Sequence, residues 1–281
     1  MMPYTAVATI VFYKNSSEQV VNVVSACAKL SNTTVLIIDN SPDESINKYL
    51  SELIEPDIKK KVKYVHTPSN PGFGASHNLA IKYFPNVDYY FIVNPDVYFE
   101  YNVNTMIDYI ESQPDIGCLV PKVVYPNGRL QKLCKLLPSP MDLFLRRFIP
   151  ALSFITDKKL MLLGYDYTFL LDIPYASGCF MLIRGDIFRN IGGFDERFFM
   201  YLEDTDLSRR IARISRVVFY PDVCIVHEFS KASYKNKKIM AIHIISALKY
   251  FNKWGWFLDK ERNSMNKKTL DMIMQFETKE G

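Results

Sequence analysis

Four short strand-like runs constrain the fold more than any other feature of this sequence. They are Ala6–Tyr13, Thr34–Asp39, Lys61–His66 and Asp88–Val93. The first is continuous and β-branched, as in a strand that is buried on both faces. Between the runs, helical spacing appears after a capping serine (Ser16 or Ser17), over Glu44–Ile54 and over Ala75–Tyr83. This alternation predicts βαβ units and an α/β fold with an open, mostly parallel sheet.

Two acidic residues follow apolar runs at the expected ligand-binding edge of this sheet. Asp39 ends the second run, and Asp96 closes the Asn94-Pro95-Asp96 turn after the fourth. In open parallel sheets, ligands bind beyond the carboxyl ends of the strands. A carboxylate is a suitable ligand for Mg²⁺ or Mn²⁺, and such an ion can bridge a diphosphate. The alternative for Asp96 is a plain turn without a ligand.

The pattern changes after residue 125. Pro126-Asn127-Gly128 predicts a turn, and Pro138–Leu171 predicts an irregular segment, either over a cleft or as a packing insert. Further strands are predicted over Ile173–Ile183, Val217–Tyr220 and Asp222–Val226, and further helices over Asp204–Ile214 and Ile239–Phe251.

Three carboxylates crowd the start of the helix predicted from residue 204. They are Glu203, Asp204 and Asp206. Acids in a first helical turn stabilise the helix dipole, which is the structural explanation. Three in four residues exceed what a cap needs, and crowding can raise a pKa toward that of a useful general base. The aromatic stretch Gly192–Tyr201 before them suits either the wall of a sugar site or core packing.

Two other segments are candidates for binding. His227 follows an apolar strand and either makes a structural hydrogen bond or completes a metal site with Asp96. The segment Asn70–Asn78 contains Gly72 and Gly74, which allow the backbone to approach a ligand before a helix that can receive an anion. It does not match G-x-G-x-x-G, so it does not indicate a dinucleotide site.

Composition excludes several classes of protein. With 48% hydrophobic and 23% charged residues, the chain is not disordered. Its five cysteines are scattered without a C-x-x-C pair, which favours reduced thiols over a zinc cluster or disulfide framework. No apolar run reaches the roughly 18–20 residues that span a bilayer, and the N-terminus lacks the features of an export signal. These features predict a cytoplasmic globular protein.

The basic charge is concentrated near the C-terminus. Residues 231–270 carry a net charge of +8, whereas the whole chain carries +4. A nucleic-acid enzyme would also be basic around its cleft, so no nucleic-acid partner is expected. The charge predicts a basic, helical extension over residues 231–281 after a catalytic domain over residues 1–230. The extension either packs on that domain or contacts an anionic membrane through Lys235–Lys238 and Trp254–Trp256.

Seven segments, taken in order, resemble the family 2 glycosyltransferases, and within them the bacterial rhamnosyltransferase-like branch. They are Thr9–Asn15 (TIVFYKN), Leu36–Ser41 (LIIDNS), Asn70–Asn78 (NPGFGASHN), Phe91–Val97 (FIVNPDV), Ser177–Arg184 (SGCFMLIR), Gly192–Asp206 (GGFDERFFMYLEDTD) and Tyr220–His227 (YPDVCIVH). The resemblance implies a GT-A fold with a Rossmann-like nucleotide half. It also implies an inverting transfer from a nucleotide-sugar with a divalent ion, Mg²⁺ or Mn²⁺.

The resemblance assigns roles to individual residues. Asp39 matches the acid that recognises the pyrimidine base of the donor, and Asp96 matches the last acid of a D-x-D-type metal motif. Asn94 replaces the first acid of that motif, so His227 and the diphosphate are expected to complete the metal site. Asp204 matches the catalytic base, with Glu203 as a second candidate. The expected donor-binding residues are Phe12, Tyr13, Asn15, Asp39, Gly72, Asn78, Asn94 and Asp96.

The resemblance also implies a substrate class. It favours transfer of L-rhamnose from dTDP-rhamnose to a saccharide or polyprenyl-diphosphate-linked acceptor, in O-antigen (lipopolysaccharide) or capsule synthesis at the inner face of the cell membrane. Donors of galactofuranose or N-acetylhexosamine remain alternatives. So do a nucleotidyltransferase and a non-catalytic sugar-nucleotide-binding protein. A nucleotidyltransferase should have a glycine-rich basic loop after the first strand, where this sequence has Tyr13–Ser17.

Overall fold

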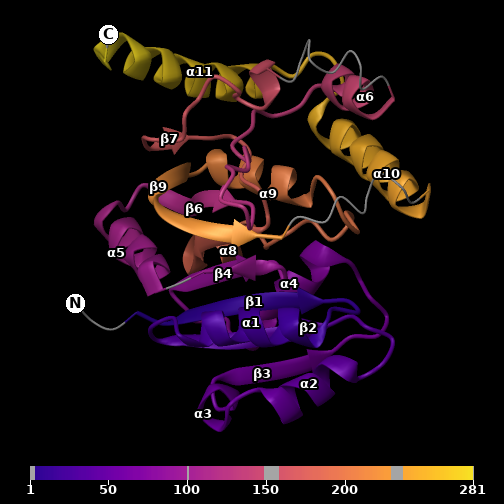
Figure 1. Cartoon of the computed structure of the whole chain (residues 1–281). Helices are drawn as coiled ribbons and strands as arrows, with labels where there is room; N and C mark the ends of the chain where they lie inside the picture. The colour runs from indigo at the N-terminus through magenta and orange to yellow at the C-terminus, as the bar shows by residue number, and fades with distance from the viewer. Residues whose placement is uncertain (1–3, 100, 149–157, 229–236, 281) are drawn as a thin grey trace.

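The computed structural model describes residues 4–99, 101–148, 158–228 and 237–280 (Figure 1). Its strands are β1 (Ala6–Phe12), β2 (Thr33–Asp39), β3 (Val62–His66), β4 (Tyr89–Val93), β5 (Val97–Tyr98), β6 (Ile116–Val124), β7 (Leu171–Asp172), β8 (Phe180–Arg184) and β9 (Arg216–His227). Its helices are α1 (Ser17–Ala28), α2 (Ser45–Leu53), α3 (Pro56–Lys59), α4 (Phe73–Tyr83), α5 (Asn104–Ser112), α6 (Pro140–Phe148), α8 (Gly185–Asn190), α9 (Glu203–Ala212), α10 (Lys237–Trp254) and α11 (Lys260–Glu280).

One sheet runs through the molecule in the order β3-β2-β1-β4-β8-β6-β9-β5, and β7 pairs with β9. The first four of these strands are parallel and stack in this order in Figure 1. All seven residues of β1 except Val11 are buried, and β4 is buried throughout. The predicted α/β class and parallel first half are therefore confirmed.

The second half of the sheet is mixed. Strand β8 is antiparallel to both β4 and β6, whereas β6 and β9 are parallel. The strands predicted over Val217–Tyr220 and Asp222–Val226 are wrong as separate elements, because both belong to β9. A register shift between Tyr220 and Cys224 opposite Pro121 and Lys122 absorbs the extra residues, which include Pro221. A bulge, rather than a turn, explains this proline.

The strand predicted over Ile173–Ile183 is correct only for Phe180–Ile183, which belong to β8, because the chain leaves the sheet between β7 and β8. Pro174 and Gly178 lie in this stretch and weaken its strand character. The backbone N–H of Ala176 instead donates to the hydroxyl of Ser208 in α9 at 3.1 Å. The loop thus gives up sheet hydrogen bonds for contacts to the helix that carries Glu203 and Asp204.

Helices cover both faces of the sheet. Helices α1, α2 and α5 pack on one face through residues such as Val24, Leu50 and Ile107, and α4, α8, α9 and α11 pack on the other. All five cysteines are free thiols, and burial raises the pKa of the Cys27 thiol above its ordinary range. A three-layer α/β/α arrangement therefore places the polar strand ends outside the core.

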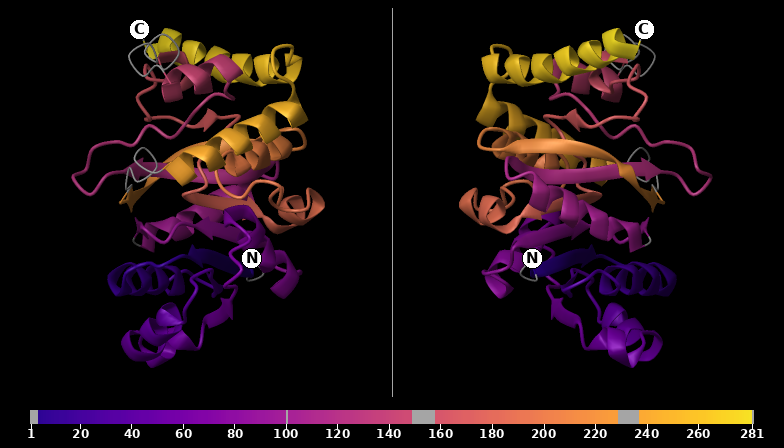
Figure 2. Two further views of the ribbon diagram at one scale, coloured as in Figure 1. Left: turned by 90° about the vertical axis from the view of Figure 1, so that its right-hand side faces the viewer. Right: turned by 90° about the vertical axis from the view of Figure 1, so that its left-hand side faces the viewer.

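The segment predicted to be irregular over Pro138–Leu171 contains helix α6, which contacts α10. Residues 149–157 of that segment lie outside the described residues. Helix α10 extends across the side of the domain, and α11 lies beyond it at the end farthest from β3 (Figure 2). Among the helices of the described residues, none is both long and apolar enough to cross a membrane.

The C-terminal helices pack on the domain through an apolar cluster. Tyr250 and Phe251 of α10 contact Phe198 and Leu202, which precede α9, and Trp254 packs against this group. The hydroxyl of Ser246 donates to the carbonyl of Met200 at 2.8 Å. The expected domain boundary at residue 230 lies outside the described residues.

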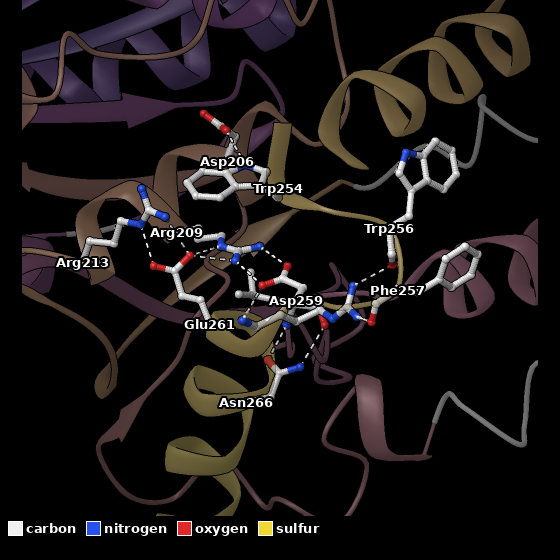
Figure 3. Close-up of polar contacts among 11 residues, drawn as sticks. Asp206, Arg209, Arg213, Trp254, Trp256, Phe257, Asp259, Glu261 and Asn266 are labelled. Carbon is white, nitrogen blue, oxygen red and sulfur yellow. Dashed lines mark hydrogen bonds and ion pairs between the residues drawn. The ribbon is translucent and has the colours of Figure 1, made fainter. Parts of the chain in front are cut away.

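A buried ion cluster anchors the turn between α10 and α11 (Figure 3). Arg209 of α9 donates two parallel hydrogen bonds to Asp259 at 2.6 and 2.7 Å, and two to Glu261 at 2.7 and 2.9 Å. Trp254 stacks on Arg209, with the guanidinium 4.2 Å from its ring centroid, and donates to Asp206 at 2.8 Å. The prediction that Trp254 contacts lipid is therefore wrong. Lys235 lies outside the described residues.

Candidate active site

Asp204 lies at the start of α9, where backbone and side-chain donors hold its carboxylate. The N–H of Gly178 donates to Oδ2 at 3.1 Å, and the N–H of Thr205 donates to Oδ1 at 2.7 Å. The Tyr175 hydroxyl donates to Oδ2 at 3.4 Å. Burial raises the pKa of Asp204, and the Gly178 N–H partly offsets this rise. These donors favour the ionised carboxylate over the acid.

Glu203 is the buried neighbour of Asp204, and its side chain has different surroundings. Within the described part of the chain, its Oε2 atom has no hydrogen-bond partner. Burial and then the charge of Asp204 raise the pKa of Glu203 well above its ordinary value. Glu203 is buried and Asp204 is half-buried, and each negative charge disfavours the other. The ionisation of Glu203 is disfavoured more, because the hydrogen-bond donors are on Asp204.

The two residues before α9 adopt an unusual backbone. Tyr201 and Leu202 have φ angles of 71° and 64°, which are strained for residues with side chains. This turn directs the acidic end of α9 into a cleft of about 790 Å³. Glu203, Asp204 and His227 line the cleft together with Tyr175, Tyr201, Lys135 and residues of α10. The cleft therefore combines carboxylates with cationic, aromatic and apolar groups.

Strand pairing brings Asp96 and His227 together across 131 positions of sequence. Val97 of β5 pairs with His227 of β9, and the N–H of Glu228 donates to the Asp96 carbonyl at 2.9 Å. As a result, His227 Nε2 lies 3.3 Å from Asp96 Oδ1. The sequence predicted each residue as a metal ligand, and the sheet places them side by side.

Gln131 orients the His227 ring and was not identified from the sequence. Its side-chain Nε2 donates to the carbonyls of His227 at 2.6 Å and Val124 at 3.4 Å, so its Oε1 faces His227 Nδ1 at 3.1 Å. An acceptor at this position places the imidazole proton on Nδ1. The other ring nitrogen, Nε2, faces the Asp96 carboxylate. No local motif marks a buried glutamine for this role.

The separation of Asp96 Oδ1 and His227 Nε2 suits two neighbouring ligands of a divalent cation as well as a direct hydrogen bond. Neighbouring ligands at about 2.1 Å from an octahedral ion are roughly 3 Å apart, close to the observed separation. In the described ranges, no group of three or more His, Cys, Asp or Glu side chains is suited to a metal. Water and phosphate oxygens would therefore supply the remaining ligands.

Asp39 is fully buried at the end of β2, with both carboxylate oxygens accepting hydrogen bonds. Oδ1 accepts from the N–H of Ser41 and Oδ2 from the hydroxyl of Tyr64, both at 2.8 Å. Each oxygen retains a second lone pair, but the side chain is 0% exposed in this conformation, so the predicted contact of Asp39 to a donor stays a prediction. Burial and the hydrogen bond to Asp39 raise the pKa of the Tyr64 hydroxyl above its ordinary value. Tyr64, another residue missed from the sequence, thus fixes the carboxylate.

The predicted residues after β1 divide into core and surface. Phe12 is completely buried in the hydrophobic core, so its predicted contact to a donor through its side chain is corrected. Tyr13 is 52% exposed, and its N–H donates to Asn15 Oδ1 at 2.9 Å. The Lys14 N–H donates to Ser41 Oγ at 2.9 Å, which joins this turn to the end of β2. Tyr13 remains available to stack on a flat ligand.

Gly72 and Asn78 hold the protein together rather than presenting free groups to a ligand. A Cβ at Gly72, where φ is 104°, would lie 2.4 Å from the carbonyl oxygen of Phe199. The Asn78 amide donates to the Phe194 carbonyl at 2.9 Å and accepts from the Phe194 N–H at 2.7 Å. Their predicted donor contacts are therefore corrected. The half-buried Asn94 bonds through its N–H to the Cys179 carbonyl.

The sequence matches a known protein family and named relatives. The family model described as Glycosyl transferase family 2 matches residues 9–192, well over half of the chain. The N-acetylglucosaminyl-diphospho-decaprenol L-rhamnosyltransferase of Mycobacterium tuberculosis (strain CDC 1551 / Oshkosh) is 26% identical over 215 residues, covering 69% of this chain and 66% of that protein. The chain thus spans slightly less than two thirds of this relative.

A second relative and a solved structure extend the comparison. The rhamnosyltransferase WbbL of Escherichia coli (strain K12) is 28% identical over 198 residues, covering 64% of this chain and 69% of that protein. The structure of GalNAc-T7 with UDP, GalNAc and Mn²⁺ superimposes with a TM-score of 0.67 at 14% identity, over 92% of this chain and 49% of that one. At this identity the superposition shows a shared fold.

Proposed function

Because the chain belongs to glycosyl transferase family 2 and has the GT-A fold, we propose that it transfers a sugar from a nucleotide-sugar donor to an acceptor hydroxyl, with inversion at the anomeric carbon. One observation carries the proposal. The Glu203–Asp204 carboxylate pair and His227, with Asp96 beside it, converge on one cleft. A base and a cation-binding pair at one cleft are what a direct displacement on a sugar diphosphate requires.

Asp204 acts as the general base in this proposal. Its carboxylate removes the proton of the acceptor hydroxyl as that oxygen attacks the anomeric carbon from the face opposite the diphosphate. The new C–O bond forms as the bond to the diphosphate oxygen breaks, and the proton stays on Asp204. Glu203, which retains its own proton, keeps a second negative charge away from the attacking oxygen. Anomeric inversion follows from this single displacement.

Asp96 and His227 are the residues that would hold Mg²⁺ or Mn²⁺, while Gln131 fixes the His227 ring. A bound divalent ion would neutralise the negative charge that develops on the leaving diphosphate. Asp39 accepts a hydrogen bond from the donor's pyrimidine base, and the exposed Tyr13 and the turn at Asn15 lie beside the nucleotide. Asn94 flanks Asp96 at the strand end.

We propose L-rhamnose, carried by dTDP, as the transferred sugar and a lipid-linked saccharide as its acceptor. Both relatives above are named rhamnosyltransferases, and the mycobacterial name specifies an acceptor on decaprenol diphosphate. Such an acceptor places the reaction in surface-polysaccharide synthesis at the inner face of the cell membrane. The apolar residues that line the cleft beside Lys132 and Lys135 suit a ligand with both lipid and diphosphate parts.

A donor panel tests the proposed function. The full chain is incubated with dTDP-rhamnose, UDP-galactofuranose or UDP-N-acetylglucosamine, with Mn²⁺ and a polyprenyl-diphosphate saccharide, and products are measured by mass spectrometry. We expect the rhamnosylated product, with the inverted anomeric configuration by NMR. Preference for another sugar would correct the donor, and binding without turnover of any donor would indicate a non-catalytic protein.

Asp96→Ala and His227→Ala are each expected to weaken Mn²⁺-dependent donor binding. Asp96→Ala should have the larger effect, because it removes the charged ligand. Calorimetric titration of dTDP into each variant, with Mn²⁺ or with EDTA, measures the metal-dependent part of the affinity. If both variants keep the wild-type difference between these two conditions, the pair is structural.

Transfer activity is expected to fall with decreasing pH at values above the ordinary aspartate range. Burial raises the pKa of Asp204, and the Asp204 carboxyl group must be ionised to accept a proton. The proton is therefore taken up, and activity lost, as the pH falls through this raised pKa. The pH at which kcat/KM falls on the acidic side measures this pKa. A fall at the ordinary pKa of an exposed aspartate would contradict the assignment of Asp204 as the base.

A further inference from the structure

The turn between α10 and α11 exposes three consecutive large apolar residues. Trp256, Phe257 and Leu258 are 36%, 79% and 96% exposed, respectively. A single exposed apolar residue is common, but a contiguous exposed group marks an interaction site. Leu258 has the largest exposed fraction of the large apolar residues that the structure describes.

The structure holds this turn in place, so its exposure does not come from a loose chain end (Figure 3). Gly255, with φ at 98°, ends α10 and reverses the chain. The next residue after the apolar group is Asp259, which is buried and paired with Arg209. Asp259 also accepts from the N–H of Arg262 at 2.9 Å and thereby caps α11. The apolar tip is a fixed feature of the fold.

Helix α10 carries a second group of exposed apolar residues. Ala241, Ile245 and Leu248 are exposed and share one face of the helix, since they are spaced by four and three residues. Ile245 is 49% exposed and Leu248 is 45% exposed. In the left view of Figure 2, α10 lies at the front and runs obliquely across the side of the domain. We call Ile245, Leu248, Phe257 and Leu258 the outer face.

The charges beside the outer face have one sign. Helix α10 contains four lysines and no acidic residue. Lys237 and Lys238 are exposed at its start, and Lys260 is exposed directly after the buried Asp259. An apolar stripe with lysines at its border matches an anionic lipid surface, where each lysine adds about 1 kcal/mol. The charge pattern disfavours a basic partner.

The opposite side of α10 belongs to the candidate active site. Ile239, Met240 and His243 line the cleft that also contains Glu203 and Asp204. A helix that lies on a bilayer by its outer side would therefore place the cleft next to the lipid headgroups. A lipid-linked sugar could then reach Asp204 without leaving the membrane.

From these observations we infer that the outer face docks on an anionic bilayer, with Phe257 and Leu258 inserted and α10 parallel to the membrane plane. This inference rests on the proposed function for its purpose, the delivery of a lipid-linked acceptor. Its physical basis is independent of catalysis. The residues that contact lipid are Phe257, Leu258 and the outer side of α10, whereas Trp254 remains in the protein.

Vesicle binding tests the inference with the full chain and no substrates. Vesicles of phosphatidylcholine, with or without phosphatidylglycerol, are mixed with wild type, Phe257→Ser/Leu258→Ser, or Lys237→Gln/Lys238→Gln, and bound protein is measured by flotation. The serine pair should lower the partition coefficient about tenfold or more. Each lysine replaced should lower it about fivefold, on vesicles with phosphatidylglycerol and at low salt.

The matched control replaces two equally apolar residues on other elements. Leu53→Ser/Ile214→Ser changes side chains that are each 51% exposed and should leave vesicle binding unchanged. Equal binding of all variants, or no binding by wild type, would overturn the inference. So would a dimer in sedimentation that Phe257→Ser/Leu258→Ser dissociates, because a second copy would then cover the face.

Activity on a water-soluble acceptor separates the two proposals. Phe257→Ser/Leu258→Ser should transfer sugar to such an acceptor at the wild-type rate, because the changed residues do not line the cleft. Transfer without vesicle binding by wild type would disprove the membrane surface alone. Vesicle binding without transfer from any donor would disprove the proposed function alone.

Discussion

Asp204→Asn is expected to lower kcat about 10²–10⁴-fold and to leave donor affinity close to that of wild type. The amide cannot accept the proton of the acceptor hydroxyl, and the donor's nucleotide contacts lie at the ends of β1 and β2. The NH2 group of the new amide would face the backbone N–H of either Gly178 or Thr205, because each of these now donates to an Asp204 oxygen. Single-turnover rates and dTDP affinity are therefore measured beside the thermal unfolding midpoint.

Glu203→Gln is the control for this substitution. A protonated glutamate and a glutamine are both neutral, so this variant should retain far more activity than Asp204→Asn. Asp206 is excluded as a substitute base, because it is buried and bound by Trp254, Arg210 and Lys253 at 2.6–2.8 Å. Near-normal turnover of Asp204→Asn, with a large loss in Glu203→Gln, would transfer the role to Glu203.

Asp259→Ala is expected to lower the free energy of unfolding by about 3 kcal/mol, the low end of the cost of breaking a buried ion pair, because Arg209 keeps its hydrogen bonds to Glu261. The Arg209 and Asp259 side chains are only 1% and 3% exposed. Burial alone would raise the pKa of Asp259, but the Arg209 guanidinium lowers it below the ordinary value. This stabilisation is present at neutral pH and is lost as the pH falls through the lowered pKa. Urea unfolding at several pH values measures both effects.

Asp57→Ala provides the comparison with an exposed ion pair. Asp57 and Lys60 also lie 2.7 Å apart, but their side chains are 89% and 76% exposed. Water screens such a pair, so the loss should be at most about 1 kcal/mol. Equal effects of Asp57→Ala and Asp259→Ala would show that the cluster at Arg209 does not stabilise the fold.

The ion cluster also explains why the C-terminal helices are not a detachable tail. Arg209 lies in the same helix as Asp204, less than two turns further along. Removal of residues 231–281 would leave Arg209 without Asp259 and Glu261, and would uncover Phe198 and Leu202. For this reason the vesicle experiment uses point variants of the full chain rather than a truncation at residue 230.

The sequence predicted what depends on local pattern. The apolar runs predicted β1, β2 and β4, because strands buried on both faces need continuous apolar residues, whereas β3 is a half-exposed strand. The sequence also identified Asp96, Asp204 and His227. Each is a polar residue next to a predicted strand or helix whose formation does not require that side chain. The family resemblance followed from the order of such segments and is confirmed by the family model.

The sequence did not predict contacts between distant segments. Phe12 and Asn78 matched motif positions, yet the structure uses one in the core and the other as a clamp on Phe194. Gln131 and Tyr64 carry no motif, although they hold His227 and Asp39. A side chain's direction depends on which segments pack beside it, and no window of sequence contains that information.

The amino-acid sequence by itself thus determined the α/β class and the residue types available for chemistry, because these follow from local periodicity and composition. The family followed from the resemblance of seven ordered segments. Only the tertiary structure decided which of those residues meet. The β5–β9 register placed Asp96 beside His227. The loop between β7 and β8 supplied the Gly178 N–H that donates to Asp204. The ion pair of Arg209 with Asp259 fixed the exposed apolar turn after α10, which a helical pattern could not reveal. Each of these is a long-range contact, set by the packing of the whole chain.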